Sequence, residues 1–240
     1  LKHNSIVTMY AAFQDRTNIY LMLEYCIGGE MFTRLAKKGR FTDMVSKFYA
    51  CQIILVLEYI HSNGFVYRDM KPENILFDKQ GNIKLVDFGF STYVEKNKRL
   101  YTKLGTPHYM APEILDSNSN TGYTRVVDWW AFGCLLYEML TGNGCFGKPD
   151  DNKYEIYTRI IKRKYNIPGY VNKNAKSLIN SLLHPDLKKR LSKPSDIKAH
   201  PWFKDVDWGL FEELRIKPPF IPYIVMPSDR TNFDHFDPIV

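Results

Sequence analysis

Three short motifs follow one another along the chain, and their order and spacing constrain the fold more than any other feature. The first is Tyr67-Arg68-Asp69-Met70-Lys71-Pro72-Glu73-Asn74, the second is Asp87-Phe88-Gly89 and the third is Ala111-Pro112-Glu113. Each alone is a modest signal, since an isolated Asp-Phe-Gly is usually only a turn. Their joint occurrence by chance is very improbable, so we interpret the three motifs together as one constellation.

Hydrophobic periodicity predicts helices on both sides of these motifs. Residues 43–63 have apolar side chains at three- and four-residue steps, with Thr42 as N-cap and Gly64 as the residue that ends the helix. Residues 126–140 are apolar nearly all round, which predicts a buried helix. Shorter helices are expected over 154–162 and 175–183.

Short apolar runs separated by polar turns predict strands. Residues 6–10 and 18–24 are separated by a polar turn, and residues 75–77 and 83–86 flank a hairpin signal at 78–81. Helices and strands together predict an α+β fold. From Pro218 onward, Pro and aromatic residues replace any periodicity, so we expect an extended tail held on a surface.

Composition excludes several classes of protein. Apolar residues make up 45% and charged residues 25% of the 240-residue chain, as in ordinary soluble globular proteins. The longest uncharged apolar run, near 129–137, is far below the ~18 residues that cross a bilayer, so no membrane span is expected. The formal net charge is +7, but the sequence contains no nucleic-acid-binding motif, so no nucleic-acid partner is predicted.

Cysteine usage indicates the compartment. The four cysteines form no C-x-x-C pair, and no N-x-S/T glycosylation acceptor occurs in the sequence. Both observations favour a reducing compartment over secretion. We therefore expect a cytoplasmic protein, with the nucleus as a second location.

The three motifs resemble the catalytic loop, the magnesium loop and the end of the activation segment of protein kinases. Further features are similar to the AGC group of serine/threonine kinases, and within it to the cAMP-dependent kinases. They are Tyr in place of His in the first motif, Trp129-Trp130 after Asp128, Gly28-Gly29-Glu30-Met31-Phe32, and Asn232-Phe233-Asp234 in the tail. The resemblance implies a kinase-like fold with a mainly helical large lobe and a remnant of the small-lobe antiparallel sheet.

The resemblance also implies how the chain is divided. Residues 1–24 correspond to two strands of the small lobe, 25–203 to the hinge and the large lobe, and 204–240 to an AGC-type tail. The glycine-rich loop, the strand lysine and the helix glutamate of a kinase small lobe have no counterpart here. We therefore expect the chain to begin just after that missing helix.

Catalytic roles follow from the resemblance, residue by residue. Asp69 would orient the attacking hydroxyl and accept its proton, and Lys71 would contact the transferred phosphoryl group. Asn74 and Asp87 would bind Mg²⁺, which prefers hard oxygen ligands. Thr106 would lie near Asp69 and Lys71 and favour Ser/Thr over Tyr substrates.

An ATP site is implied around the hinge, with Leu23 as gatekeeper and the tail contributing from the side. The residues assigned to it are Leu23, Glu24, Tyr25, Glu30, Met31, Leu76, Asp87 and Phe233, with Phe236 as a further tail residue. Leu76 and Met31 would form one wall of the adenine slot.

The resemblance places an activating phosphate on Thr102, held by Arg68. Lys98 and Arg99 precede Thr102, as in sites of kinases that prefer basic residues. Thr92 stands where the family often has a second basic partner, so a looser hold on the phosphate is expected. Structural roles are implied for three further residues: Asp128, and Glu113 with Arg190 as a buried ion pair.

Acidic residues predict a basic substrate. Glu30, Glu73 and Glu138 match positions that receive arginines before the target hydroxyl, and arginine binds carboxylates bidentately. His108 stands where a further acidic residue is expected, which predicts weaker selectivity for more distant arginines. Protein substrates with Arg before Ser/Thr are therefore expected as partners, and an inhibitory regulatory subunit is a further partner at the level of resemblance.

A second glycine pattern, Gly142-x-Gly144-x-x-Gly147, is not interpreted as a phosphate loop, because it follows a predicted buried helix rather than a strand. We expect a surface loop there, with Cys145 exposed. Two hypotheses remain for the whole chain: an active serine/threonine kinase using ATP and Mg²⁺, or a catalytically silent kinase-like binding module. The presence of every large-lobe catalytic residue favours the first.

Overall fold

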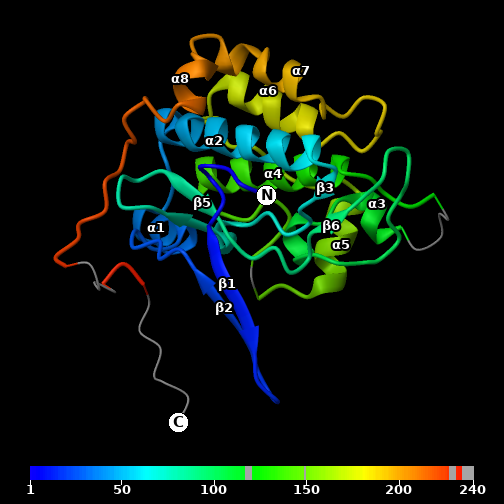
Figure 1. Ribbon diagram of the computed structural model, residues 1–240. Helices are drawn as coiled ribbons and strands as arrows, with labels where there is room; N and C mark the ends of the chain where they lie inside the picture. Colours follow the sequence, from blue (N-terminus) through cyan, green and yellow to red (C-terminus); the bar gives the residue numbers. More distant parts are fainter. Residues whose placement is uncertain (117–120, 149, 227–230, 234–240) are drawn as a thin grey trace.

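The computed structural model describes residues 1–116, 121–148, 150–226 and 231–233. Most of the polypeptide forms a helical lobe, from which one long β-hairpin projects (Figure 1). The helices are α1 Met31–Lys38, α2 Asp43–Ser62, α3 Pro112–Leu115, α4 Val126–Thr141, α5 Lys153–Ile161, α6 Lys173–Leu182, α7 Pro194–Lys198 and α8 Trp208–Glu212. The strands are β1 Met9–Gln14, β2 Ile19–Leu23, β3 Phe65–Val66, β4 Ile75–Phe77, β5 Ile83–Leu85 and β6 Thr92–Tyr93. The α+β prediction is confirmed.

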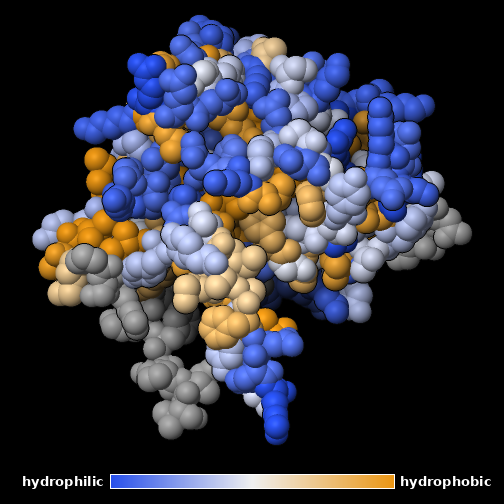
Figure 2. Space-filling model, in the orientation of Figure 1, coloured by the Kyte–Doolittle hydropathy of each residue, from blue (hydrophilic) through white to orange (hydrophobic). Residues whose placement is uncertain are grey.

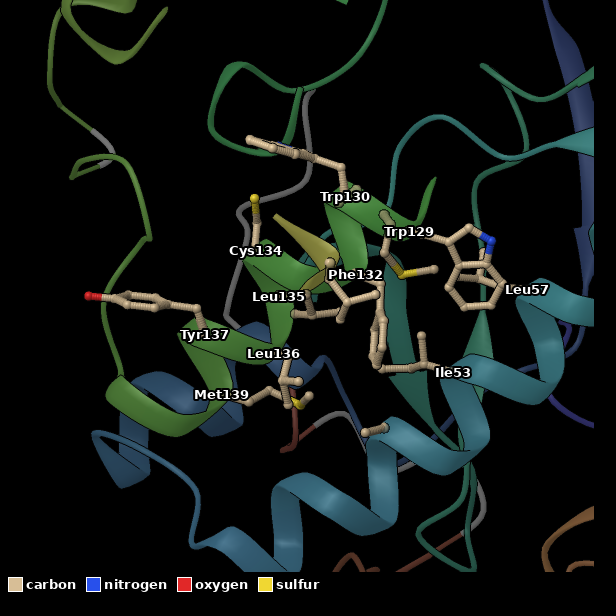
Figure 3. Packing of buried hydrophobic residues seen from close by; sticks show 14 of the residues in the cluster. Ile53, Leu57, Trp129, Trp130, Phe132, Cys134, Leu135, Leu136, Tyr137 and Met139 are labelled. Carbon is tan, nitrogen blue, oxygen red and sulfur yellow. The ribbon is translucent and has the colours of Figure 1, made fainter. Parts of the chain in front are cut away.

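Helices α2 and α4 form the centre of the hydrophobic core. Along α4 the buried positions face all directions, as its apolar sequence predicts, and Trp130 and Phe132 are completely inaccessible. Figure 3 shows Phe132 of α4 pointing toward α2, where Ile53 is equally buried. Burying one such side chain contributes about 1.5–3 kcal/mol, so this helix pair is the rigid base of the lobe.

The ends of α2 are determined locally by the sequence. The Thr42 hydroxyl accepts a hydrogen bond from the Val45 N–H at 3.3 Å, which satisfies one of the free donors at the helix start. Just after the helix, Gly64 adopts φ +80°, a conformation that favours glycine. Both predicted boundary residues are confirmed, and the helix ends one residue earlier than expected.

The predicted hairpin at 75–86 forms as β4 and β5, paired antiparallel with Ile75 opposite Leu85. Gln52 on α2 holds this hairpin to the helical core: its amide donates to Asn82 Oδ1 at 2.8 Å and accepts from the Ile83 N–H at 3.0 Å. The loops before β4 and after β5 therefore have fixed starting points.

The first predicted strand is displaced. Ile6 was expected to open a strand over 6–10, but β1 begins at Met9. Ile6 is instead buried in the lobe, and its neighbour Val7 donates its N–H to the Leu85 carbonyl at 3.0 Å. Ile6 is therefore apolar because it is buried against β5, and not because it belongs to a strand of the first hairpin. The β1–β2 pair is exposed along its length, and Figure 2 shows hydrophobic colour where it leaves the lobe.

Hydrophobic periodicity predicts α5 and α6 to within two residues but does not predict α1, α7 or α8. Helix α1 is only eight residues long and begins directly after the close turn at Gly28 and Gly29, where φ of Gly29 is +77°. Within the described ranges, no helix is both long and apolar enough to cross a bilayer.

The tail follows the surface of the lobe, as predicted, after contributing helix α8. Phe211 of α8 packs against Phe48 of α2 with ring centres 5.3 Å apart, and Phe220 packs against Phe77 of β4 at 5.6 Å. Further on, the Asn232 amide donates to the Ile27 carbonyl at 3.2 Å. Asp234 and Phe236 lie outside the described residues.

The loop with the second glycine pattern is a helix C-terminus and not a phosphate loop. Gly142 adopts φ +75° and donates its N–H to the Glu138 carbonyl, which closes α4. The expectation that Cys145 is exposed is wrong, since only 7% of it is accessible. The adjacent Phe146 stacks on Trp130, with ring centres 5.7 Å apart, and draws this part of the loop into the core.

The expected ion pair between Glu113 and Arg190 is present and bidentate. Arg190 Nη1 lies 2.6 Å from Glu113 Oε1, and Nη2 lies 2.9 Å from Oε2. The arginine side chain is completely buried, and its guanidinium lies over the Trp130 ring. The pair therefore attaches the segment around α3 to the helical core.

Replacing Arg190 by Met should lower the free energy of unfolding by about 3–5 kcal/mol, because it leaves the Glu113 carboxylate without its buried partner. Urea denaturation followed by far-UV circular dichroism measures the change. Arg215→Met is the matched control, because Arg215 pairs with Glu213 at the exposed surface, where a change within about 0.5 kcal/mol is expected. Equal losses in the two variants would contradict a structural role for the buried pair.

Candidate active site

The loop that bears the first motif is held by one buried carboxylate. Asp128, in the first turn of α4, is fully inaccessible. Its Oδ1 accepts the Arg68 N–H at 2.8 Å, and its Oδ2 accepts the Tyr67 N–H at 2.9 Å. The same Oδ2 lies 2.7 Å from His61 Nε2 at the end of α2. Asp128 thus joins α2, α4 and the loop.

These contacts hold the loop in an unusual backbone conformation. Arg68 adopts φ +71°, which is uncommon for a residue with a side chain. Such a conformation persists when surrounding contacts over-determine it. Here the contacts are the hydrogen bonds from the Tyr67 and Arg68 N–H groups to the Asp128 carboxylate. The turn at Arg68 directs the next residue, Asp69, into the site.

The four residues predicted to be catalytic lie together. The Asn74 amide donates to the Asp69 carbonyl at 2.9 Å and to Asp69 Oδ2 at 2.8 Å. The Thr106 hydroxyl donates to Asp69 Oδ1 at 2.8 Å. Lys71 Nζ lies 2.8 Å from Asp69 Oδ2 and donates to the Thr106 hydroxyl at 3.2 Å. Asp69 is only 5% exposed, and these contacts orient its carboxylate.

The second motif continues this arrangement. Asp87 follows β5, is exposed and adopts φ +51°, while its Oδ1 accepts the Gly89 N–H at 3.0 Å. The Val86 N–H donates to the Asn74 carbonyl at 3.0 Å, which holds the two loops side by side. Phe88 packs edge-on against Tyr67, with ring centres 5.2 Å apart.

Two oxygen donors in this region fit Mg²⁺. Because the Asn74 amide nitrogen is committed to Asp69, its side-chain oxygen is the atom left for a cation, and Asp87 retains Oδ2. Within the described ranges no cluster of three or more His, Cys, Asp or Glu could hold a metal. A pair of protein oxygens suits Mg²⁺ when phosphate oxygens and water complete the shell.

Residues expected around a nucleotide are mostly near the surface. Tyr25 stacks on Phe233 of the tail, with ring centres 6.0 Å apart, and Leu23 is 42% exposed. Leu76 is half-buried and forms an isolated antiparallel bridge with Glu30. The carboxylate of Glu24 pairs with Lys84 at 2.8 Å.

The prediction that Met31 forms a wall of the adenine slot is wrong. Its side chain is completely buried, because it begins α1 on the face that packs into the core. An unbranched thioether in this position fills the core and has no surface to offer a ligand.

Glu73 and Glu138, two of the residues predicted to receive substrate arginines, lie close together, and within the part of the chain that the structure describes no cation balances their negative charges. Burial raises the pKa of Glu138 to about 7, and the nearby charge of Glu73 adds to that rise. Among the described residues, Glu73 Oε2 is buried without a hydrogen-bond partner. The Tyr109 hydroxyl donates to the Glu138 carboxylate. A cation would relieve both carboxylates, so this pair is a candidate site for a basic side chain.

Other predicted residues occupy the edges of the site. Glu30 is the N-cap residue of α1, which packs beside the 3₁₀ turn Pro72–Asn74. Thr102 is exposed, and Thr92 lies in β6 opposite Val66. His108 Nε2 lies 2.9 Å from the Lys148 carbonyl, so His108 contacts the loop before α5.

For three residues at the site, no motif or spacing in the sequence predicts their contacts. His61, Tyr109 and Tyr123 reach Asp128, Glu138 and Arg68, respectively, from at least 29 positions away in the chain. Their rings also suit an ordinary core. Only the folded arrangement distinguishes them from packing residues.

The site thus consists of a motif-bearing loop held by the buried Asp128, with Asp69 bonded to Asn74 and the backbone of Asn74 bonded to Val86, just before Asp87. The family model described as protein kinase domain matches residues 1–203. The chain therefore belongs to the protein kinase domain family.

Within that family, the chain is similar to cAMP-dependent kinases of the AGC group. It is 44% identical to a cAMP-dependent protein kinase catalytic subunit from Dictyostelium discoideum, over 99% of this chain and 36% of the relative. It is 43% identical to a cAMP-dependent protein kinase, catalytic subunit-like, from Caenorhabditis elegans, over 99% of this chain and 59% of the relative. It is 40% identical to the human cAMP-dependent protein kinase catalytic subunit PRKX, over 98% of this chain and 65% of the relative. The chain thus spans between 36% and 65% of the length of these relatives.

Replacing Asp128 by Ala should lower the free energy of unfolding by about 2–5 kcal/mol, because it leaves the buried Tyr67 N–H and the partly buried Arg68 N–H without an acceptor. Urea denaturation measures the loss. Asp205→Ala, at an exposed position, is the control and should stay within about 0.5 kcal/mol. A loss at Asp128 no larger than the control would show that the loop is held by something else.

Proposed function

We propose that this chain is the large lobe and tail of a serine/threonine protein kinase that transfers the γ-phosphoryl group of ATP to protein hydroxyls. The observation that supports it best is the Asp69 carboxylate, held at once by Asn74, Lys71 and Thr106. Phosphoryl transfer needs mainly positioning and charge neutralisation, and a buried, oriented carboxylate beside a lysine supplies both.

Each residue would then have a defined task. Asp69 would accept a hydrogen bond from the substrate hydroxyl and take its proton, while the hydroxyl oxygen bonds to the γ-phosphorus and the bond from that phosphorus to the leaving ADP breaks. Lys71 places a positive charge beside that point and stabilises the developing negative charge. Thr106 and Asn74 hold the carboxylate in orientation. Asn74 and Asp87 would bind Mg²⁺, which supplies charge neutralisation at the phosphates when it is bound.

We also propose that the substrates are proteins with arginine before the target Ser or Thr. Glu73 and Glu138 support this, because a guanidinium is always charged and can pair bidentately with carboxylates, and Glu73 Oε2 is buried without a partner among the described residues while burial raises the pKa of Glu138. Glu30, at the start of α1, is the further acidic residue proposed for this role. A regulatory subunit that presents a similar basic segment would compete for the same surface.

A cytoplasmic or nuclear location remains part of the proposal. All four cysteines, Cys26, Cys51, Cys134 and Cys145, are free and buried. Burial raises the pKa of the Cys26 and Cys51 thiols to about 12, so these thiols stay protonated and unreactive at neutral pH.

Asp69→Asn should reduce phosphate transfer from ATP to an Arg-Arg-x-Ser peptide by about 10²–10⁴-fold, because the amide cannot accept the hydroxyl proton. The assay uses the full-length polypeptide that contains this sequence, with radiolabelled ATP. Asp205→Asn, at an exposed site, is the control and should keep full activity. If even the unaltered protein transfers no phosphate, the alternative function, a catalytically silent binding module, is favoured.

Peptide affinity should rise with pH through about 7. Burial raises the pKa of Glu138 from its ordinary value of 4.5 to about 7, so protonation below pH 7 removes the charge that would attract an arginine. The ionised fraction climbs from about one tenth at pH 6 to about nine tenths at pH 8, so KM for the peptide should fall by up to about tenfold. Steady-state kinetics at saturating ATP measure this change.

In Glu138→Gln, KM should be high and independent of pH across this range. A peptide with Ala in place of the arginines is a second control, since its KM should not respond to Glu138. If both enzymes show the same pH profile, Glu138 does not bind the arginine.

A further inference from the structure

The segment that contains Thr102 is attached to the chain just before α4. Leu100 and Tyr123 form an isolated antiparallel bridge, with N–H to carbonyl distances of 2.9 and 2.8 Å in the two directions. One residue back, Arg99 Nη1 donates to the Gly122 carbonyl at 3.3 Å. The backbone just before Thr102 is therefore not free to move independently of residues 122–123.

Gly122 permits this close approach. It adopts φ +60°, and a Cβ placed there would lie 2.7 Å from the Leu100 carbonyl oxygen and 2.8 Å from the Tyr101 ring. Real Cβ atoms do not approach backbone oxygen so closely, so any larger residue would push the two segments apart.

A single hydroxyl then links the Thr102 segment to the catalytic loop. The Tyr123 hydroxyl donates to the Thr102 carbonyl at 2.6 Å and accepts from Arg68 Nη1 at 3.2 Å. Tyr123 is only 2% exposed, so water does not compete readily for these bonds. Both partners are needed to satisfy this hydroxyl as donor and as acceptor.

Arg68 extends the connection to the second motif. Its Nε donates to the Phe90 carbonyl at 2.6 Å, directly after Asp87-Phe88-Gly89, and its backbone N–H is held by Asp128. The bonds from Arg68 to the Phe90 carbonyl and to the Tyr123 hydroxyl use two of the five guanidinium N–H donors, and both of these acceptors are neutral. The connection from Thr102 through Tyr123 to Arg68 therefore runs through neutral groups of the protein itself: the Thr102 carbonyl and the Tyr123 hydroxyl.

We propose that Tyr123 is a positioning residue that holds the Thr102 segment against the catalytic loop while Thr102 is unphosphorylated. This inference rests on the proposed kinase function. A phosphate on the exposed Thr102 side chain would add an ionic contact to Arg68, which already holds the segment through Tyr123. The Tyr123 hydroxyl should therefore contribute more to activity without the phosphate than with it.

The first test measures attachment and needs no enzymatic activity. Lys98, Arg99 and Lys103 are trypsin sites within the segment. In the unphosphorylated protein, Tyr123→Phe should accelerate cleavage there by about five- to tenfold, the factor that corresponds to the loss of about one net hydrogen bond. Gly122→Ala should do the same through the backbone, with the hydroxyl still present. Mass spectrometry of the fragments locates the cuts.

Tyr137→Phe is the matched control, because its hydroxyl donates to the Asn166 carbonyl, a contact outside this segment. It should leave cleavage at the three sites unchanged. A thermal melt of each variant checks that the fold is intact. Equal cleavage rates in Tyr123→Phe, Tyr137→Phe and the unaltered protein would overturn the proposal.

The second test is a kinetic cycle with Thr102→Ala, which removes the phosphate site but keeps the backbone carbonyl. In the Thr102→Ala background, Tyr123→Phe should lower kcat by about five- to tenfold. In the Thr102-phosphorylated protein it should lower kcat by less than about twofold. KM for ATP and peptide should change by less than about twofold in both, since the hydroxyl would contact neither.

Equal losses of kcat in the two backgrounds would overturn the proposal, because a purely structural tyrosine would act regardless of the phosphate. If no form of the protein transfers phosphate, the proposed kinase function fails. The proteolysis test still decides in that case whether Tyr123 holds the segment. The two failures are thereby distinguishable.

Discussion

The Asp128 carboxylate is the interaction on which the rest of the site depends. It is buried in the first turn of α4, where the helix dipole favours negative charge, and it accepts the N–H groups of Tyr67 and Arg68. These two bonds help to hold Arg68 at its positive φ, and the turn there places Asp69 beside Asn74. The α2–α4 core therefore does more than pack apolar side chains, because it carries a carboxylate that holds the backbone of the catalytic loop.

Two kinds of polar arrangement lie side by side in the lobe. In the network of Asp69, Asn74, Lys71 and Thr106, each carboxylate oxygen of Asp69 has at least one partner. Satisfied buried networks are rigid, which suits a group that must orient a hydroxyl. The pair Glu73 and Glu138 is incomplete, with an unpartnered oxygen and a raised pKa. An incomplete pair of carboxylates suits a site that a cationic side chain completes.

Much of the fold was predictable because local rules govern it. The α2 boundaries at Thr42 and Gly64 and the β4–β5 hairpin follow from capping and turn chemistry. The sequence-based predictions fail where the burial of a residue depends on contacts with distant parts of the chain. Ile6 is apolar because it packs against β5, and Cys145 is buried because the neighbouring Phe146 stacks on Trp130. Met31 was expected to line a ligand slot, but the start of α1 turns it into the core.

The sequence alone determined the order of the motifs, the helix–strand pattern and the chemistry available to the site. Each follows from residue types at short spacing, where periodicity and turn preferences act. Only the tertiary structure decided which distant groups meet. The hydroxyls of Tyr109 and Tyr123 find Glu138 and Arg68 across 29 and 55 positions, respectively. Hydrogen bonds between such distant positions depend on how α4 and the loops pack together, and no local pattern in the sequence encodes that packing.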